Sequence, residues 1–380
     1  MLSIYFIINL FVNYYDSPVT VGFSPEMINV QNIPFPAVTI CTTNIALKSR
    51  AKAIIESGSP EHHLILDDLC RSNSTNYGDI GPISWDTMES VIINITQKCS
   101  EMLVGCKWQG KTRDCSELID YVLTDDGYCC TFNKLPYKYV YRHDFAGTNF
   151  TYPNNVVNWY PEVGYPANIK DDIYPYRAFG RGVQQGLTVV LDSAMHEYYC
   201  SVSNGFGFKI LFHSPRESPK IADLGYLLEP GVESRIAVNV DVQLATDSIR
   251  GIDYRKRKCF FTDEKFLRYF QLYSATNCLL ECEANYTEEM CGCIPYYLPR
   301  DQDTNLCDKS DDTCTTQAKY IIERYGKEKL ASNTGGLLSL FLGFSFMTVV
   351  ELIYFLFIRG ACVWCQSRQH NQQHQQVFVK

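Results

Sequence analysis

Apolar residues run almost without interruption from position 335 to position 358, in the sequence GGLLSLFLGFSFMTVVELIYFLFI. About 20 consecutive apolar residues are enough for a helix to cross a bilayer, so this stretch predicts a membrane-spanning helix. It contains one acid, Glu351, and the small residues Gly343 and Ser345. A carboxylate in hydrocarbon usually faces a helix bundle or a water-filled path, and small residues let helix backbones approach closely. On the span alone, two interpretations remain open: the wall of a pore, or a plain single-span anchor.

A second and shorter apolar run extends from Leu2 to Val12 and is interrupted by Asn9. A run of about eleven residues is too short to span a membrane. One hypothesis is a signal peptide, although no basic residues precede the run and no small-residue cleavage site follows it. The other is the outer half of a transmembrane helix whose start is absent from this chain.

Between the two runs, the pattern is mostly that of β-strands. Apolar residues alternate with polar ones at Ile236, Val238, Val240 and Val242, which is typical of a half-buried strand. Residues 206–212 alternate in the same way. Residues 186–192 form a short β-rich run between turn formers. The sequence therefore predicts strands at all three places.

Helical spacing appears further along the chain. Phe266, Tyr269, Phe270 and Tyr273 lie at i, i+3, i+4 and i+7, which predicts an aromatic helical face in the core. The four-residue spacing of Cys278 and Cys282 places these two on one face of a helix.

Cysteine usage indicates the compartment. The chain has 17 cysteines, of which 15 lie between Cys41 and Cys314. Such density before a membrane span indicates an oxidising compartment and a disulfide framework. The same region holds four N-x-S/T sequons, at Asn73, Asn94, Asn149 and Asn285. Together these features predict an extracellular domain that is large enough for its own core.

The composition argues against several classes of protein. The net charge is −8 and there is no basic run, so we expect no nucleic-acid partner. The chain also lacks a dinucleotide fingerprint, a nucleophile elbow and a zinc-ligand helix, so we expect neither enzyme activity nor a cofactor. The acidic pairs Asp125-Asp126 and Asp171-Asp172 are interpreted as solvated turns.

The polar tail after the span offers one further candidate site. Cys362 and Cys365 are more simply a pair of reduced or lipidated thiols than a metal site, because no further Cys or His has the spacing of a zinc site. His370 and His374 are interpreted as solvated. We therefore expect no bound metal.

A series of short motifs follows in a fixed order along the chain. They are Phe35-Pro36-Ala37-Val38-Thr39-Ile40-Cys41, Cys106-x-Trp108 with Cys115, Gly127-Tyr128-Cys129-Cys130-Thr131-Phe132-Asn133, Glu197-Tyr198-Tyr199-Cys200, Gly207-Phe208-Lys209-Ile210, His213-Ser214-Pro215, Cys278-x-x-x-Cys282, Cys291-Gly292-Cys293, Gly335-Gly336, Leu340, Gly343-Phe344-Ser345 and Glu351. Each motif alone is weak. Their order resembles the degenerin/epithelial sodium channel family, and in particular its insect pickpocket subgroup.

The resemblance implies a membrane protein of the α+β class. Its acid-sensing-channel-like ectodomain would have a β-sheet palm with helical thumb, finger and knuckle parts, joined to transmembrane helices. The expected division is a partial first transmembrane helix (1–15), an extracellular disulfide-rich domain (16–334), a second, pore-lining transmembrane helix (335–358) and a cytoplasmic tail (359–380). The implied location is the plasma membrane, with two membrane helices in lipid and the ectodomain outside the cell.

The resemblance also implies a function. Family members are amiloride-sensitive, voltage-independent channels that conduct Na⁺ through a pore formed by three subunits, identical or related. Gly343, Phe344 and Ser345 match the selectivity filter, and Glu351 would contribute to an acidic ring. Ser339 matches the position that binds the blocker, and Ser332 matches the degenerin position, where bulky side chains hold family channels open.

The family's disulfide pattern can be carried over in part. It implies the pairs Cys41–Cys129, Cys106–Cys115, Cys291–Cys314 and Cys293–Cys307. Cys70, Cys99, Cys130 and Cys200 are then expected to pair among themselves, with Cys130–Cys200 favoured. Cys259, Cys278 and Cys282 are expected to lack their usual partners.

The chain departs from the family pattern in two places. A cysteine-containing segment and further palm strands are absent between Cys314 and Ser332, and the N-terminus lacks the cytoplasmic gating motif and half of the first helix. The sequence therefore looks like an incomplete chain. The alternatives are a single-span receptor or adhesion ectodomain, and a non-conducting subunit that modulates full-length partners. The sequence does not indicate the gating stimulus.

Overall fold

The computed structural model describes residues 28–70, 83–142 and 151–324, apart from 154, 167–172, 202, 204, 241, 244 and 302; before these it describes residues 8, 11, 14, 15, 19 and 22. The chain divides into two units, Met1–Thr315 and Thr316–Lys380. In the second unit, the described residues 316–324 are helical. The sheets, disulfides and cavity that follow all belong to the first unit.

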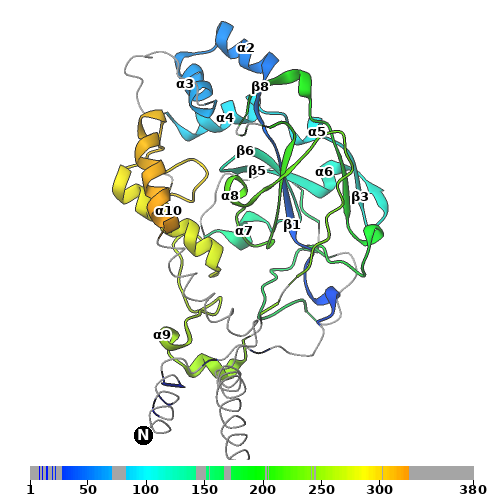
Figure 1. Ribbon diagram of the computed structural model, residues 1–380, viewed down its shortest axis with the longest axis vertical. Helices are drawn as coiled ribbons and strands as arrows, with labels where there is room; N and C mark the ends of the chain where they lie inside the picture. The colour runs from blue at the N-terminus through cyan, green and yellow to red at the C-terminus, as the bar shows by residue number, and fades with distance from the viewer. Residues whose placement is uncertain are drawn as a thin grey trace, which may run out of the picture. The chain divides into compact units, whose positions relative to one another are not determined.

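The centre of the first unit is a five-stranded antiparallel sheet with the strand order β10-β9-β1-β6-β5 (Figure 1). Its strands are β1 (Ala37–Thr42), β5 (Ile119–Thr124), β6 (Gly127–Phe132), β9 (Phe208–His213) and β10 (Tyr226–Leu228). Every residue of β1 and β6 is buried. Burial on both faces explains why these strands lack an alternating apolar pattern.

Two buried threonines and the half-buried His213 form a polar chain across the middle of this sheet. Thr131 Oγ1 of β6 lies 3.1 Å from Thr39 Oγ1 of β1, which lies 2.8 Å from His213 Nε2 of β9. His213 Nδ1 lies 2.9 Å from the Ser214 carbonyl oxygen. A carbonyl can only accept, so Nδ1 carries the proton. Burial lowers the pKa of His213 and so favours the neutral imidazole, in which Nε2 accepts from the Thr39 hydroxyl. The chain of bonds fixes the register of three strands.

Two smaller sheets flank the first. One has the order β4-β3-β7, with β3 (Leu103–Trp108), β4 (Lys111–Arg113) and β7 (Leu187–Leu191), and the other pairs β2 (Asn44–Leu47) with β8 (Tyr198–Ser201). The strand predicted at residues 186–192 is confirmed as β7, and the one predicted at 206–212 is confirmed in its main part as β9.

Helices cover the ends and sides of the sheets. They are α2 (Lys48–Ser57), α3 (Pro60–Leu69), α4 (Trp85–Ile95), α5 (Cys99–Met102), α6 (Cys115–Leu118), α7 (Tyr137–Val140), α8 (Ile221–Leu224), α9 (Tyr254–Arg257) and α10 (Ala275–Cys291). Short 3₁₀ turns lie at Val30–Asn32, Val183–Gln185, Met195–Glu197, Asp247–Gly251 and Lys309–Asp311. In Figure 1, α2, α3 and α4 gather at one end of the sheets.

Local sequence signals set the ends of α4 and α10. Ser84 and Ser274 are their N-caps, and each side chain accepts a hydrogen bond from a backbone N–H of the first turn. Helix α10 ends at Gly292, whose φ of 74° is the left-handed conformation that favours glycine. Cys278 and Cys282 both lie on α10, as their spacing predicts.

The aromatic helix predicted at residues 266–273 is wrong. These residues form turns and one β-bridge, between Phe270 and Tyr141. Tyr269 and Phe270 are both fully buried, while Phe266 is 72% exposed. Their burial comes from a core cluster that they share with Leu280 of α10 and with α7.

The strand predicted at residues 236–242 is also wrong. Ile236, Val238, Val240 and Val242 are 39–52% exposed, and no strand is assigned there among the described positions. The preceding strand, β10, is the edge of the five-stranded sheet, and its Tyr226 is 68% exposed. A strand needs a neighbour to satisfy its backbone groups, and the described part of the chain supplies none beyond β10. The alternating pattern therefore remains in the sequence without the sheet that would bury it.

Six disulfides cross-link the first unit. Four are the pairs implied by the family resemblance: Cys41–Cys129, Cys106–Cys115, Cys291–Cys314 and Cys293–Cys307. The favoured pair Cys130–Cys200 is wrong, because Cys130 bonds Cys99 and Cys200 bonds Cys70. The reason lies in the sheets: Cys130 is on β6 and opposes Ile40 of β1, whereas Cys200 is on β8 and opposes Ala46 of β2. Cys259, Cys278 and Cys282 are free thiols.

The described residues contain no helix that is long and apolar enough to cross a membrane. The span expected at residues 335–358 lies outside the described residues, as does most of the expected partial helix at 1–15.

We predict that His213 makes the fold sensitive to acid. Burial and, to a smaller extent, the positive charge of Lys134 together lower its pKa from 6.5 to about 4. Between these two values the unfolded chain binds a proton that the folded protein does not, so stability falls as the pH drops through this window. Between pH 7 and pH 4, the free energy of unfolding is expected to fall by about 3 kcal/mol. Denaturant titrations of the purified chain at these two pH values measure the change.

The variant His213→Gln is expected to flatten this part of the pH profile, because it removes the titrating group. The exposed His196→Gln is the matched control and is expected to leave the profile unchanged. An acid profile that His213→Gln leaves intact would contradict the assignment.

Candidate functional site

The residues expected to form the pore lie outside the described residues. They are Ser332, Ser339, Gly343, Phe344, Ser345 and Glu351. The sequon asparagines Asn73 and Asn149 also lie outside. Asn94 on α4 and Asn285 on α10 are described, and both are exposed, as a glycan attachment site requires.

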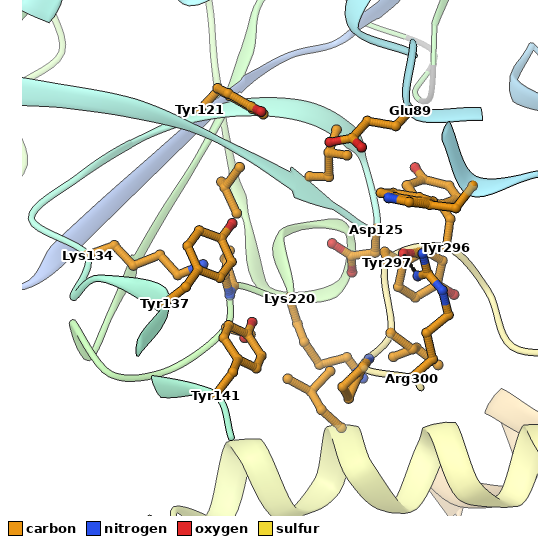
Figure 2. A pocket seen from close by; sticks show the side chains of 18 residues that line it. Glu89, Tyr121, Asp125, Lys134, Tyr137, Tyr141, Lys220, Tyr296, Tyr297 and Arg300 are labelled. Carbon is orange, nitrogen blue, oxygen red and sulfur yellow. Dashed lines mark hydrogen bonds between the residues drawn. The ribbon is translucent and has the colours of Figure 1, made fainter. Parts of the chain in front are cut away.

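A cavity of about 100 Å³ lies among β5, α4, α7, α10 and the segment 296–300. Figure 2 shows its side chains converging from these elements on one space. The wall is rich in tyrosine, with Tyr121, Tyr137, Tyr141, Tyr296 and Tyr297. A concave site with aromatic walls and a few charged groups is the usual form of a ligand site in proteins.

Aromatic stacking holds the segment 296–300 against α4. The rings of Trp85 and Tyr296 are stacked, with their centroids 6.5 Å apart. The guanidinium of Arg300 lies 4.2 Å from the centre of the Trp85 ring, close enough for a cation–π interaction. Glu89, one helical turn after Trp85, has a raised pKa because burial disfavours its charge. This side of the cavity is therefore fixed by contacts between α4 and the segment.

The β5–β6 turn closes another part of the cavity through its two acids. Asp125 Oδ1 accepts hydrogen bonds from the backbone N–H groups of Ile221 and Ala222, at 3.0 and 3.2 Å. Asp126 Oδ2 lies 2.5 Å from Lys209 Nζ on β9, and both side chains are largely buried. The interpretation of Asp125-Asp126 as a solvated turn is thus wrong, because packing against β9 and α8 buries both carboxylates. Asp171-Asp172 lies outside the described residues.

Lys220 and Lys134 bring positive charge to the cavity in different ways. Lys220 Nζ lies 2.6 Å from Glu283 Oε2 of α10 and 3.5 Å from Asp223 Oδ2, so its charge is compensated. Lys134, which follows β6, is only 4% exposed. Its ammonium nitrogen lies 4.7 Å from the ring centre of Tyr137 and 5.9 Å from that of Tyr141. Burial lowers the pKa of Lys134 from 10.5 to about 8.

The tyrosines of the cavity are neutral at physiological pH. Burial raises the pKa of Tyr137 well above its ordinary value, and it also raises those of Tyr141, Tyr296 and Tyr297. Each hydroxyl therefore keeps its proton and can donate a hydrogen bond. Tyr141 Oη and Ser218 Oγ lie 2.5 Å apart and share a hydrogen bond in which either hydroxyl can be the donor.

Sequence reasoning did not single out this cavity. Its residues come from six separate segments, and no motif joins them. The nearest signal is the position of Lys134, directly after the motif that ends at Asn133. A lysine after a strand is ordinarily solvated, so its position alone does not predict a buried lysine.

A possible metal cluster among the described residues does not fit a metal. Cys293, Cys307 and Asp311 bring potential ligand atoms within 4.8 Å of one another. However, the two sulfurs are bonded to each other at 2.01 Å. A metal would need free thiolates, which a disulfide does not offer.

Comparison with known proteins identifies the family of the chain. The family model described as "Amiloride-sensitive sodium channel" matches residues 1–329 and, in a second part, 321–355. Pickpocket protein 28 of Drosophila melanogaster is 31% identical over 456 residues, which cover 98% of this chain and 74% of that protein. Because 456 aligned positions exceed the 380 residues of the chain, this relative carries segments that have no counterpart here.

Two other relatives are more distant. Sodium channel protein Nach of Drosophila ananassae is 22% identical over 322 residues, covering 80% of this chain and 56% of that protein. The bile acid-sensitive ion channel of Rattus norvegicus is 27% identical over 312 residues, covering 78% of this chain and 53% of that protein. The chain thus spans little more than half the length of these two.

The matches agree across insects and a mammal, and they describe ion channels rather than enzymes. The family model accounts for both the disulfide-rich region and the apolar span. The chain belongs to the amiloride-sensitive sodium channel family.

Proposed function

We propose that this chain is a subunit of an amiloride-sensitive, voltage-independent Na⁺ channel of the plasma membrane. The observation that carries the proposal is the second part of the family match, residues 321–355, because it includes all the residues expected to form the pore. Three subunits, of this chain or of related ones, surround a pore lined by residues 335–358. The chain contacts lipid there and at residues 1–15, and the domain 16–334 lies outside the cell.

The proposed filter is the step Gly343-Phe344-Ser345. Glycine at position 343 permits a break in the helix, so that backbone carbonyls face the pore. These carbonyls and the Ser345 hydroxyl replace part of the hydration shell of Na⁺. Glu351 lies about two helical turns further along, where three copies form an acidic ring that attracts cations.

The extracellular placement of residues 16–334 is supported by the described part of that region. It carries six disulfides, which persist in oxidising compartments. Asn94 and Asn285 are exposed, as glycan attachment needs. Both features are expected of a domain that passes through the secretory pathway.

A second candidate is a subunit that conducts only together with full-length relatives. Two observations favour it: the open edge of the sheet at β10, and the three free thiols Cys259, Cys278 and Cys282. Pickpocket protein 28 carries segments that this chain lacks. The open sheet edge and the free thiols of this chain therefore need not occur in that relative. On this alternative, the chain modifies a heteromeric channel and does not form one alone.

The filter can be tested in a chain completed with the additional segments of the relative. Gly343→Asp and Ser345→Ala are expected to change the Na⁺ to K⁺ permeability ratio by about tenfold, since one oxygen–ion contact is worth about 1.5 kcal/mol. Reversal potentials in Na⁺, Li⁺ and K⁺ solutions measure this. Glu351→Gln is the matched control, expected to lower conductance more than selectivity, because it removes a charge away from the constriction. Reversal potentials that stay the same in both filter variants would exclude this step as the filter.

The chain of 380 residues, expressed alone, is expected to give no amiloride-sensitive current and to be largely retained inside the cell. The physical reasons are the exposed apolar edge around Tyr226 and Leu227 and the free thiols, both of which promote association during secretion. Surface biotinylation and current recordings measure these two outcomes.

Two variants separate the causes of retention. Replacing Cys259, Cys278 and Cys282 with serine removes the thiols, and Leu227→Lys places a charge on the open edge. Each is expected to raise the surface fraction severalfold if its feature causes retention. Strong surface expression with a Na⁺ current from the unaltered chain would contradict the prediction.

A further inference from the structure

The buried ammonium of Lys134 is the least compensated charge of the cavity. Among the described residues, its contacts are the rings of Tyr137 and Tyr141, and no ion pair or hydrogen bond to its nitrogen is found there. Aromatic rings attract a cation, but a carboxylate would do so more strongly at the same depth. The carboxylate of Asp120 on β5 attracts the Lys134 ammonium and compensates its charge in part. Burying an incompletely compensated charge is costly, and such sites are uncommon outside functional positions.

The other charges that line the cavity are engaged with protein groups. Lys220 is paired with Glu283, and Arg300 lies on Trp85 close to Glu89. Asp125 accepts hydrogen bonds from two backbone N–H groups. The positive charge of Lys134 is therefore the one available for a ligand at its side of the cavity.

We propose that this cavity binds a small organic carboxylate, whose anionic group pairs with the Lys134 ammonium.

The walls favour an organic anion over a simple ion. Figure 2 shows Lys134 reaching toward Tyr137 at one side of the cavity, with Tyr296 and Tyr297 across from it. Leu280 and Leu298 also line the cavity and add apolar surface to its wall. A charged head at Lys134 and a short apolar tail along these side chains match that arrangement.

The size of the cavity limits the ligand. A cavity of about 150 Å³ holds one benzene molecule, and this cavity measures about 100 Å³. A carboxylate with about two to four carbons is therefore the expected size. Because the walls come from α4, α7, α10 and the segment 296–300, a bound ligand contacts several elements at once. The site does not depend on whether the chain conducts ions.

The test uses the full chain, purified in detergent, with sodium butyrate as the probe. Saturation-transfer NMR is expected to detect butyrate bound to the unaltered protein, and the melting temperature is expected to rise with butyrate concentration. Butyramide, which has the same shape without the charge, is expected to bind at least about tenfold more weakly, because it cannot form the charged pair.

Three variants identify the partner of the carboxylate. Lys134→Met is expected to weaken butyrate binding by about tenfold or more, and Lys134→Arg is expected to retain most of it. Lys138→Met is the matched control, because Lys138 also lies against a tyrosine ring, that of Tyr139, but is exposed. It is expected to leave binding unchanged.

Several outcomes would overturn the proposal. They are no butyrate signal from the unaltered protein, equal binding of butyramide, equal stabilisation by sodium chloride at the same ionic strength, or binding that Lys134→Met leaves intact. The NMR measurement on the unaltered protein decides the question even if a variant fails to fold.

Affinity is also expected to depend on pH. Lys134 loses its proton above about pH 8, so butyrate binding is expected to weaken as the pH rises through that value. The titratable or charged groups around it are Asp120 and Tyr121 of β5, Tyr137 of α7, Tyr141 directly after α7, Tyr152, Tyr174, His213 of β9, Asp125 and Lys220. The pKa of His213 is about 4, so it is neutral throughout the window. An affinity that stays constant from pH 7 to pH 9.5 would contradict the role of Lys134.

Discussion

The structure depends on the complete burial of β1 between β6 and β9. All six residues of β1 are buried, so the strand has no solvent-facing side that would tolerate a shift. A slip by one residue would exchange the two faces of the strand and break the hydrogen bonds of Thr39 to Thr131 and His213. The Cys41–Cys129 disulfide joins β1 and β6 at directly opposed positions. Register, polar satisfaction and covalent linkage thus all require the same alignment.

That alignment positions the cavity. Because β6 is fixed against β1, the residues that precede and follow it are fixed as well. The β5–β6 turn brings Asp125 to the start of α8, and the chain after β6 places Lys134 beside α7. Helix α10 then packs its apolar face on residues 267–270, which brings Leu280 to the same space. The buried lysine is therefore a consequence of the sheet's register, and not of a local motif.

The β10 edge of the sheet shows what happens to a strand-like sequence that has no neighbouring strand. β10 has three residues and one partner strand, β9. Beyond it, residues 236–242 keep the alternation of a strand but remain exposed. The same sequence pattern is thus realised as a strand at β9 and not at 236–242, because only β9 finds hydrogen-bonding partners on both sides.

The sequence by itself determined the class of protein and much of its framework. The order of short motifs indicated the family, and the apolar run at 335–358 indicated a membrane span, because such signals are local and survive in one chain. The family pattern also implied four disulfides that the structure contains. Local spacing placed Cys278 and Cys282 on a helix and residues 187–191 in a strand.

Only the tertiary structure decided the remaining features. The partners of Cys99 and Cys200 follow from which strands lie side by side, a non-local property that spacing does not encode. The aromatic residues 266–273 have helical spacing but are buried by contacts with α7 and α10, so periodicity was misleading there. The burial of Lys134 likewise depends on segments that are distant in sequence and meet only in the folded protein. Packing between distant segments is the physical reason in each case, because it overrides local preference wherever the two disagree.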